Sequence, residues 1–190
     1  SPDNVYDSYV STYLQRDVRQ ILNIKDLSLF QKFLTIVASR VGNVFIASSI
    51  ASELGVDYKT IQSWMSILET SYTAFLLQPF HRNIGKRLTK TPKIYFYDIG
   101  LVCHLLGIEN EQHIKNHPLR GAIFENMVVC EMLKRRYNKG LKSNLYFYRD
   151  QSAEVDVIQE EAGSIKTYEI KSAERFNQEF TKSLSYVQKL

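Results

Sequence analysis

The sequence contains little cysteine and no long run of apolar residues. Its two cysteines, Cys103 and Cys130, lie in apolar stretches and lack metal-ligand spacing. They argue against a disulfide-rich secreted scaffold and predict a reduced, cytoplasmic protein with buried thiols. The most apolar segment, residues 94–108, contains Asp98 and His104 and is too short to cross a bilayer. No secretory signal is recognisable, so we expect no membrane partner.

Acidic residues are absent between Glu69 and Asp98, although the whole chain carries 20 of them. The same stretch contains five basic residues, namely Arg82, Lys86, Arg87, Lys90 and Lys93. The net charge of +4 is only a weak indication of an anionic partner, whereas this local excess predicts a phosphate-contacting surface. A solvated turn is the alternative for the central three, Lys86, Arg87 and Lys90.

The first half of the chain has the apolar spacing of helices. Residues 9–22 and 27–41 repeat apolar side chains at helical intervals, and residues 46–69 have the pattern of a helix-turn-helix with Gly55 at the turn. Two β-rich runs, 74–80 and 93–97, follow it and are joined by the basic segment, as in a winged helix. The exposed positions of the second helix, which would contact DNA in a major groove, are Lys59, Thr60, Gln62 and Ser63. Docking of another protein is the alternative.

The second half predicts an α/β unit, α+β overall for the whole chain. A polar linker precedes a helix over 121–137, which three short strands follow at 144–149, 153–159 and 165–171. A last helix is expected from Gln178. His113 and His117 have helical metal-ligand spacing, but they lie in the polar linker, so we assign them no metal.

Strand periodicity selects the acidic residues that can meet. On the middle strand, Asp156 is expected to share a face with Glu154 and Ile158, and on the next strand Glu169 shares a face with Lys171. Two carboxylates and the carbonyl of Ile170 would hold Mg²⁺, and the lysine would position a water or stabilise a developing anion. This combination predicts phosphodiester hydrolysis. Solubility is the alternative for charged residues on surface strands.

Glu125 lies on the apolar side of the helix over 121–137, together with Val128, Val129 and Met132. Burying a carboxylate costs several kcal/mol unless a cation or donor compensates it. We therefore expect Glu125 to have a partner near the metal-binding strand pair.

These motifs together resemble a known family. Gly121–Glu125, Tyr146–Asp150, Glu154–Asp156 and Glu169–Lys171 resemble the C-terminal region of a large prokaryotic ATPase family, catalogued as domain of unknown function 4143. The segments Tyr13–Asp17 and Lys93–Leu101 extend the resemblance over nearly the whole chain.

The resemblance implies a winged helix and then a PD-(D/E)xK restriction-endonuclease-like αβββα domain, behind an N-terminal AAA-type P-loop ATPase domain. It implies catalytic roles for Glu125, Asp156, Glu169 and Lys171, with Asp156 and Glu169 as Mg²⁺ ligands. No G-x-x-x-x-G-K-[ST] motif occurs, so ATP is expected only in the full-length protein. The predicted divisions are a helical segment (1–45), a winged helix (46–106), a linker (107–120) and a nuclease-like domain lacking its last strand (121–190).

On this interpretation the chain is a piece of a longer cytoplasmic protein. Its expected partners are DNA, the ATPase domain in the same polypeptide and, as an open option, a second copy of itself. The alternative function is a non-enzymatic module that binds DNA or protein, or regulates the ATPase, with a vestigial nuclease fold.

Overall fold

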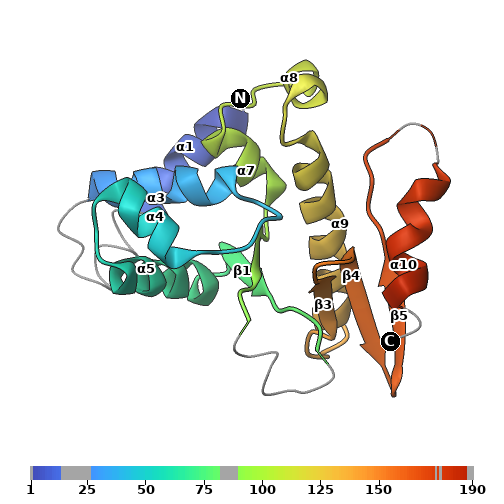
Figure 1. Cartoon of the computed structure of the whole chain (residues 1–190). Helices are drawn as coiled ribbons and strands as arrows, with labels where there is room; N and C mark the ends of the chain where they lie inside the picture. Colours follow the sequence, from blue (N-terminus) through green and yellow to red (C-terminus); the bar gives the residue numbers. More distant parts are fainter. Residues whose placement is uncertain (1, 14–26, 82–89, 174, 176, 188–190) are drawn as a thin grey trace. The chain divides into compact units, whose positions relative to one another are not determined.

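The chain combines helices and short strands in two compact units. The computed structural model describes residues 2–13, 27–81, 90–173, 175 and 177–187 (Figure 1). A helical unit is formed by Ser1–Val41, Ile46–Phe75 and Phe96–Pro118, and a sheet unit by Gly42–Phe45, Leu76–Tyr95 and Leu119–Leu190. The chain therefore passes between the units more than once, whereas the sequence predicted consecutive domains. Residues 76–95, expected in the winged helix, belong to the sheet unit.

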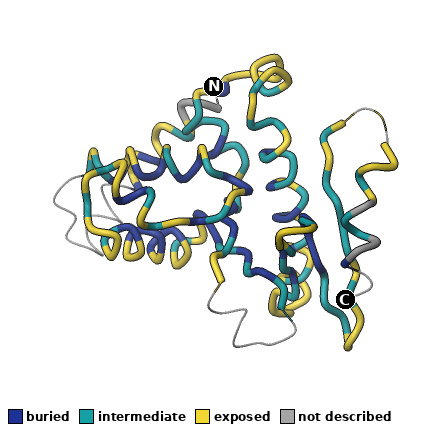
Figure 2. Tube along the Cα trace, viewed as in Figure 1, coloured by how far each residue is buried: buried dark blue, intermediate teal, exposed yellow. Residues whose placement is uncertain are grey.

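The helical unit is built around an aromatic core. Its helices are α1 (Pro2–Thr12), α3 (Leu27–Ser39), α4 (Ala47–Leu54), α5 (Tyr58–Thr70), α7 (Ile99–Leu105) and α8 (Glu111–Asn116). The Trp64 ring lies 5.4 Å from the rings of both Phe30 and Phe33. Ile61, one turn before Trp64, is fully buried. Figure 2 shows the alternation of buried and exposed residues along α5 that this packing requires.

The two helices predicted for the helix-turn-helix are confirmed. Gly55 ends α4 with φ at +68°, a left-handed conformation that a residue without a Cβ adopts readily. Asp57 caps α5 by accepting a hydrogen bond from the Lys59 amide at 2.8 Å. Their assignment to a DNA-binding winged helix stays a prediction.

The segment expected to be a linker contains a helix. Asn110 accepts a hydrogen bond from the His113 amide and so caps α8, which occupies residues 111–116. The linker over 107–120 stays a prediction; within it a good N-cap lets six residues, all polar except Ile114, form a short helix without burying a side chain.

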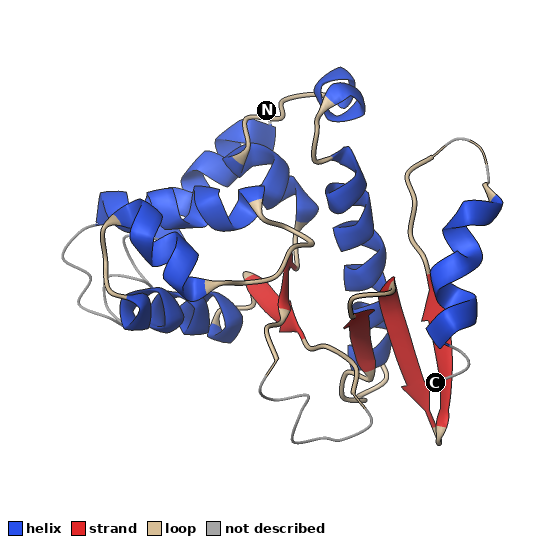
Figure 3. Cartoon of the chain, viewed as in Figure 1, coloured by secondary structure: helices blue, strands red, loops and turns tan. Residues whose placement is uncertain are grey.

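The sheet unit places three antiparallel strands between two helices (Figures 1 and 3). Strands β3 (Leu145–Arg149), β4 (Glu154–Glu161) and β5 (Ser164–Tyr168) pair in that order. They are preceded by α9 (Arg120–Tyr137) and followed by a 3₁₀ turn, η2 (Gln178–Thr181), and α10 (Lys182–Val187). The predicted order of one helix, three strands and one helix is thus confirmed, although its nuclease-like classification stays a prediction.

A second, two-stranded sheet contains β1 (Ala74–Leu77) and β2 (Lys93–Phe96). The two strands predicted for the wing therefore form and pair. The chain after β1 runs beside β3, because the Phe80 amide donates to the Phe147 carbonyl at 2.6 Å and the Phe147 amide donates to Gln78 at 3.1 Å. The described residues on both sides of the basic segment therefore belong to the sheet unit.

A β-bulge in β4 decides which side chains share a face. Tyr148 pairs with Val155 and Tyr146 pairs with Ile158, so a two-residue step on β3 opposes a three-residue step on β4. Val155 and Ile158 consequently pack in one cluster with Val187 of α10. The prediction that Ile158 shares a face with Asp156 was wrong, because strict alternation fails where an extra residue is inserted.

Within the part of the chain that the structure describes, no helix has the length and apolar character needed to cross a membrane.

Candidate functional site

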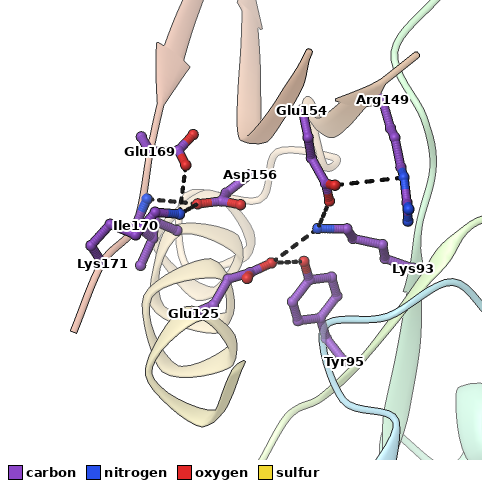
Figure 4. Close-up of polar contacts among 9 residues, drawn as sticks. All are labelled: Lys93, Tyr95, Glu125, Arg149, Glu154, Asp156, Glu169, Ile170 and Lys171. Carbon is purple, nitrogen blue, oxygen red and sulfur yellow. Dashed lines mark hydrogen bonds and ion pairs between the residues drawn. The ribbon is translucent and has the colours of Figure 1, made fainter. Parts of the chain in front are cut away.

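Asp156, Glu169 and Lys171 converge where β5 ends (Figure 4). The Lys171 ammonium lies 2.5 Å from a Glu169 oxygen and 3.4 Å from Asp156 Oδ2. The Ile170 amide donates to the same Asp156 oxygen at 2.8 Å. The sequence correctly predicted that these three side chains meet, but it wrongly extended the strand through Lys171.

The hydrogen bonds explain why β5 ends at Tyr168. The last ladder pair joins Val157 to Tyr168, and beyond it the Asp156 side chain accepts the amide that a regular ladder would use. Arg120 of α9 donates to the carbonyl of Ser172 at 3.2 Å and so ties the following segment to the helix. The Asp156 carboxylate therefore fixes the position of Glu169 and Lys171 as well as contacting the lysine.

Burial makes the ionised form of the Glu169 carboxyl group unfavourable. Desolvation raises its pKa above the ordinary value, and Asp156 adds to the rise, while Lys171 opposes it. Desolvation alone would lower the pKa of Lys171, but Glu169 and Asp156 outweigh it and leave that pKa raised. Among the described residues, the second oxygen of Glu169 is buried and has no hydrogen-bond partner. An oxygen of this kind is suited to a cation or a donor.

Glu125 is held by two residues that the sequence analysis did not assign to the site. The Tyr95 hydroxyl donates to Glu125 Oε1 at 2.5 Å, and the Lys93 ammonium lies 3.4 Å from the same oxygen. Only 14% of the Glu125 side chain and 4% of the Lys93 side chain are exposed. The expectation that Glu125 needs a partner is confirmed, but the partner comes from β2 and not from the strand pair β4–β5.

Lys93 joins a second carboxylate to this group. Its ammonium lies 2.9 Å from Glu154 of β4 and 5.4 Å from the centre of the Phe147 ring. Arg149 also approaches Glu154, at 3.5 Å. Lys93 is the first residue of a strand whose four residues are all buried, and a charge in such a strand needs partners just as Glu125 does. The sequence contained this signal, because Lys93 directly precedes the apolar residues of the strand expected over 93–97.

The electrostatics of this second group follow from its burial. Desolvation raises the pKa of Glu125, Asp156 adds to the rise, and Lys93 and Tyr95 only partly offset it. Burial alone would lower the pKa of Lys93, but Glu125 and Glu154 together raise it. Lys93 is therefore held in its charged form as an internal counter-ion that Glu125 and Glu154 share.

The residues present fit Mg²⁺ better than a metal that needs several side-chain ligands. Within the described ranges no three His, Cys, Asp or Glu side chains are arranged to hold a metal ion. Mg²⁺ commonly takes one or two carboxylates and fills its other positions with water and substrate phosphates. Asp156 and Glu169 would be those ligands.

The predicted DNA-contacting residues fall into two groups. Lys59, Gln62 and Ser63 are exposed on α5, as predicted, whereas Thr60 is half-buried; all four lie in the helical unit, and their contact with DNA stays a prediction. Of the basic segment, Lys86 and Arg87 lie outside the described residues, and Lys90 is exposed. Lys93, the last basic residue of the acid-free stretch, is buried beside Glu125 and Glu154, so the prediction of a phosphate-contacting surface was wrong for this residue.

Comparison with known proteins gives two family matches. Residues 1–112 match the family described as Domain of unknown function (DUF8612), and residues 120–190 match Domain of unknown function (DUF4143). Proteins described as uncharacterised from Mycobacterium bovis and Mycobacterium tuberculosis are each 32% identical to the chain over 167 residues. The alignment covers 87% of this chain but 37% of each relative, so the chain spans little more than a third of their length. No solved structure matches the chain.

Proposed function

The chain belongs to the family described as domain of unknown function DUF8612, and we propose that its C-terminal region cleaves phosphodiesters in DNA with bound Mg²⁺. The observation that carries the proposal is the convergence of Asp156, Glu169 and Lys171 at the end of β5. Its support is physical: two carboxylates face one ammonium group, and one of them has a buried oxygen without a hydrogen-bond partner among the described residues. The match of residues 120–190 to DUF4143 agrees with the family resemblance found in the sequence.

Each side chain has a separate task in this proposal. Bound Mg²⁺ would neutralise phosphate charge and lower the pKa of a water molecule. Asp156 and Glu169 supply the ligand oxygens. Asp156 also accepts a hydrogen bond from the Ile170 amide and so fixes the backbone that carries the Ile170 carbonyl. Lys171 orients the attacking water or stabilises the developing anion. Glu125 adds negative charge on the helix side and is kept in place by Lys93 and Tyr95.

The wider proposal is a DNA-associated module in a cytoplasmic, AAA-type ATPase. It rests on the family resemblance and on the greater length of the two relatives. ATP binding would belong to the N-terminal domain in the same polypeptide. Residues on α5, led by Lys59 and Gln62, would contact the duplex, and a second copy of the chain is a further candidate partner.

The test uses the full-length protein with Mg²⁺ or Mn²⁺ on linear, nicked and single-stranded DNA. Asp156→Asn and Glu169→Gln should each weaken divalent-ion binding, measured by calorimetry, and abolish cleavage. Lys171→Met should keep ion binding and slow cleavage by roughly a hundredfold or more. Glu161→Gln with Lys166→Met is the matched control, because it removes an exposed acid–lysine pair from the same sheet.

One observation favours a non-enzymatic alternative. Lys171 already pairs with both carboxylates, and Lys93 already pairs with Glu125 and Glu154, so each ammonium has two carboxylates as partners. A vestigial nuclease fold that only binds DNA or protein would keep such a network for stability. If the full-length protein binds no divalent ion and cuts no DNA, and the three site variants behave as the parent does, the enzymatic proposal fails and this alternative stands.

A further inference from the structure

A second acid-free stretch lies in the sheet unit, wholly within the described residues. Between Glu131 and Asp150 there is no Asp or Glu, yet there are six Lys or Arg residues. Five of them fall within residues 134–142, at the C-terminal end of α9 and in the turn that follows. We call residues 134–142 the basic knob.

The backbone makes the basic knob one compact structure. Gly140 has φ at +69°, and the Leu141 amide donates back to the Arg136 carbonyl at 3.1 Å. The Arg136 guanidinium donates twice to the Lys142 carbonyl, at 3.2 Å each. These bonds fold the chain back on the last helical turn, so Lys142 lies beside that turn and does not extend away from it.

The cations of the knob divide by what they contact. Lys134 pairs with Glu131 at 3.1 Å, and Arg136 is used by the turn. Arg135, Lys139 and Lys142 are exposed, and no ion pair to any described residue engages them. Arg135 lies in the last turn of α9, and Lys139 lies in the turn that directly follows it.

Structural roles account for only part of this charge. Basic residues in the last turn offset the negative end of the helix dipole, which explains Lys134, Arg135 and Arg136. That effect falls off within the last turn, so it gives no reason for Lys139 and Lys142, which lie beyond the helix. Exposed cations without a counter-charge are the usual contacts of a polyanion.

We infer that the basic knob binds the sugar-phosphate backbone of nucleic acid, through Arg135, Lys139 and Lys142. Charge complementarity selects this partner. A membrane surface would also need a broad apolar face, and within residues 134–142 the exposed apolar side chains are Tyr137 and Leu141, whereas Leu133 is buried. Tyr137, with 43% of its surface exposed, adds a ring on which an unpaired base can stack.

The position of the knob relates it to the carboxylate cluster. Arg135 is ten residues after Glu125 on the same helix, which is about 15 Å along the axis. That length spans about four nucleotides of a strand. A strand held by the knob would therefore reach the cluster a few nucleotides further along. Only this positioning role rests on the proposed nuclease function, because backbone binding stands independently of cleavage.

The test is the salt dependence of DNA binding by the full chain. Arg135→Gln, Lys139→Gln and Lys142→Gln together should weaken duplex binding at low salt by at least about tenfold, and reduce the slope of log K against log salt by about 2.7. The matched control neutralises three cations elsewhere, Lys32→Gln, Lys115→Gln and Lys166→Gln, and should change both quantities far less. Tyr137→Ala should weaken single-stranded binding by about tenfold and duplex binding by less.

Three results would overturn the inference. One is equal loss in the knob and control variants, which would mean that net charge alone attracts DNA. Another is an unchanged slope in the knob variant. The third is binding of the parent to vesicles containing phosphatidylserine, lost in the knob variant, without comparable binding to DNA. Cleavage is measured separately, with Asp156→Asn for comparison. If this variant binds DNA as the parent does and the parent cuts no DNA, the nuclease proposal fails and the inference about the basic knob stands.

Discussion

Replacing Lys93 by methionine tests whether the buried ion-pair network stabilises the sheet unit. Methionine keeps most of the volume and the apolar stem but removes the cation, which is the main partner of Glu125. Removing one member of a buried pair costs about 3–5 kcal/mol, because the other charge stays buried without compensation. Tyr95 still donates to Glu125, and the Glu154 side chain is 41% exposed and can be hydrated, so we expect the lower end, about 3 kcal/mol.

A double variant separates the ion pair from simple packing. Lys93→Met with Glu125→Gln removes both charges and keeps a hydrogen-bond acceptor for Tyr95. It should recover at least about half of the loss caused by Lys93→Met alone, which double-mutant cycles would report as coupling. Lys115→Met is the control, because its pair with Glu111 is fully at the surface and its loss should change stability little.

The assay has to resolve the two units, because a chain with two compact units need not unfold in one step. Hydrogen exchange of the β4 amides reports the sheet unit, and fluorescence of Trp64, the single tryptophan, reports the helical unit. We expect Lys93→Met to accelerate exchange in β4. The reasoning is refuted if β4 protection is unchanged, or if the double variant loses the sum of the two single losses.

Four further outcomes are expected. Burial raises the pKa of Glu125 above its ordinary 4.5, so the folded state binds the proton of the Glu125 carboxyl more tightly than the unfolded state does. The free energy of unfolding should therefore fall as pH rises from below 4.5 through the raised pKa. Urea titrations should show less of this fall in Glu125→Gln. Asp156→Asn can still accept from the Ile170 amide and should be nearly neutral in the metal-free protein, whereas Asp156→Ala should cost about 1–3 kcal/mol in urea unfolding. Gly42→Ala should cost about 1–2 kcal/mol by the same method, because φ is +75° there, while the new methyl would meet Ala122 and Glu125 only at ordinary contact distances. Asp98→Ala should lower the midpoint of Trp64 fluorescence unfolding by the equivalent of about 1 kcal/mol, since the Asp98 side chain caps α7; an unchanged midpoint would contradict that role.

Much of the fold follows from local pattern. The apolar spacing of α3 and α5 predicted helices whose buried residues include Phe33 and Trp64. Such features depend on neighbours within one or two turns, which the sequence contains directly. The meeting of Asp156, Glu169 and Lys171 was also predictable, because two short turns leave adjacent strands little choice of register.

The rest of the site depends on contacts that no local pattern contains. Lys93 lies 32 residues before Glu125, and its role depends on β2 joining the sheet unit, which the predicted domain order did not allow. Burial of Glu125 correctly implied a partner, yet burial does not say which distant segment supplies it. The expected strand through Lys171 failed because a side chain, Asp156, replaced the backbone acceptor.

The extra residue in β4 has a consequence for comparing this chain with its relatives. The extra residue lies between two cross-strand pairs, which join Tyr148 to Val155 and Tyr146 to Ile158. A relative with one residue fewer between those pairs would regain strict alternation, and positions outside the interval would keep their sheet faces, so the change would be confined to the positions of Asp156 and Val157. Residue count across this interval therefore matters as much as residue identity. An alignment gap between 155 and 158 would signal a rebuilt site even where Asp and Glu are retained, whereas a gap in the turns at 150–153 or 162–163 would leave it intact.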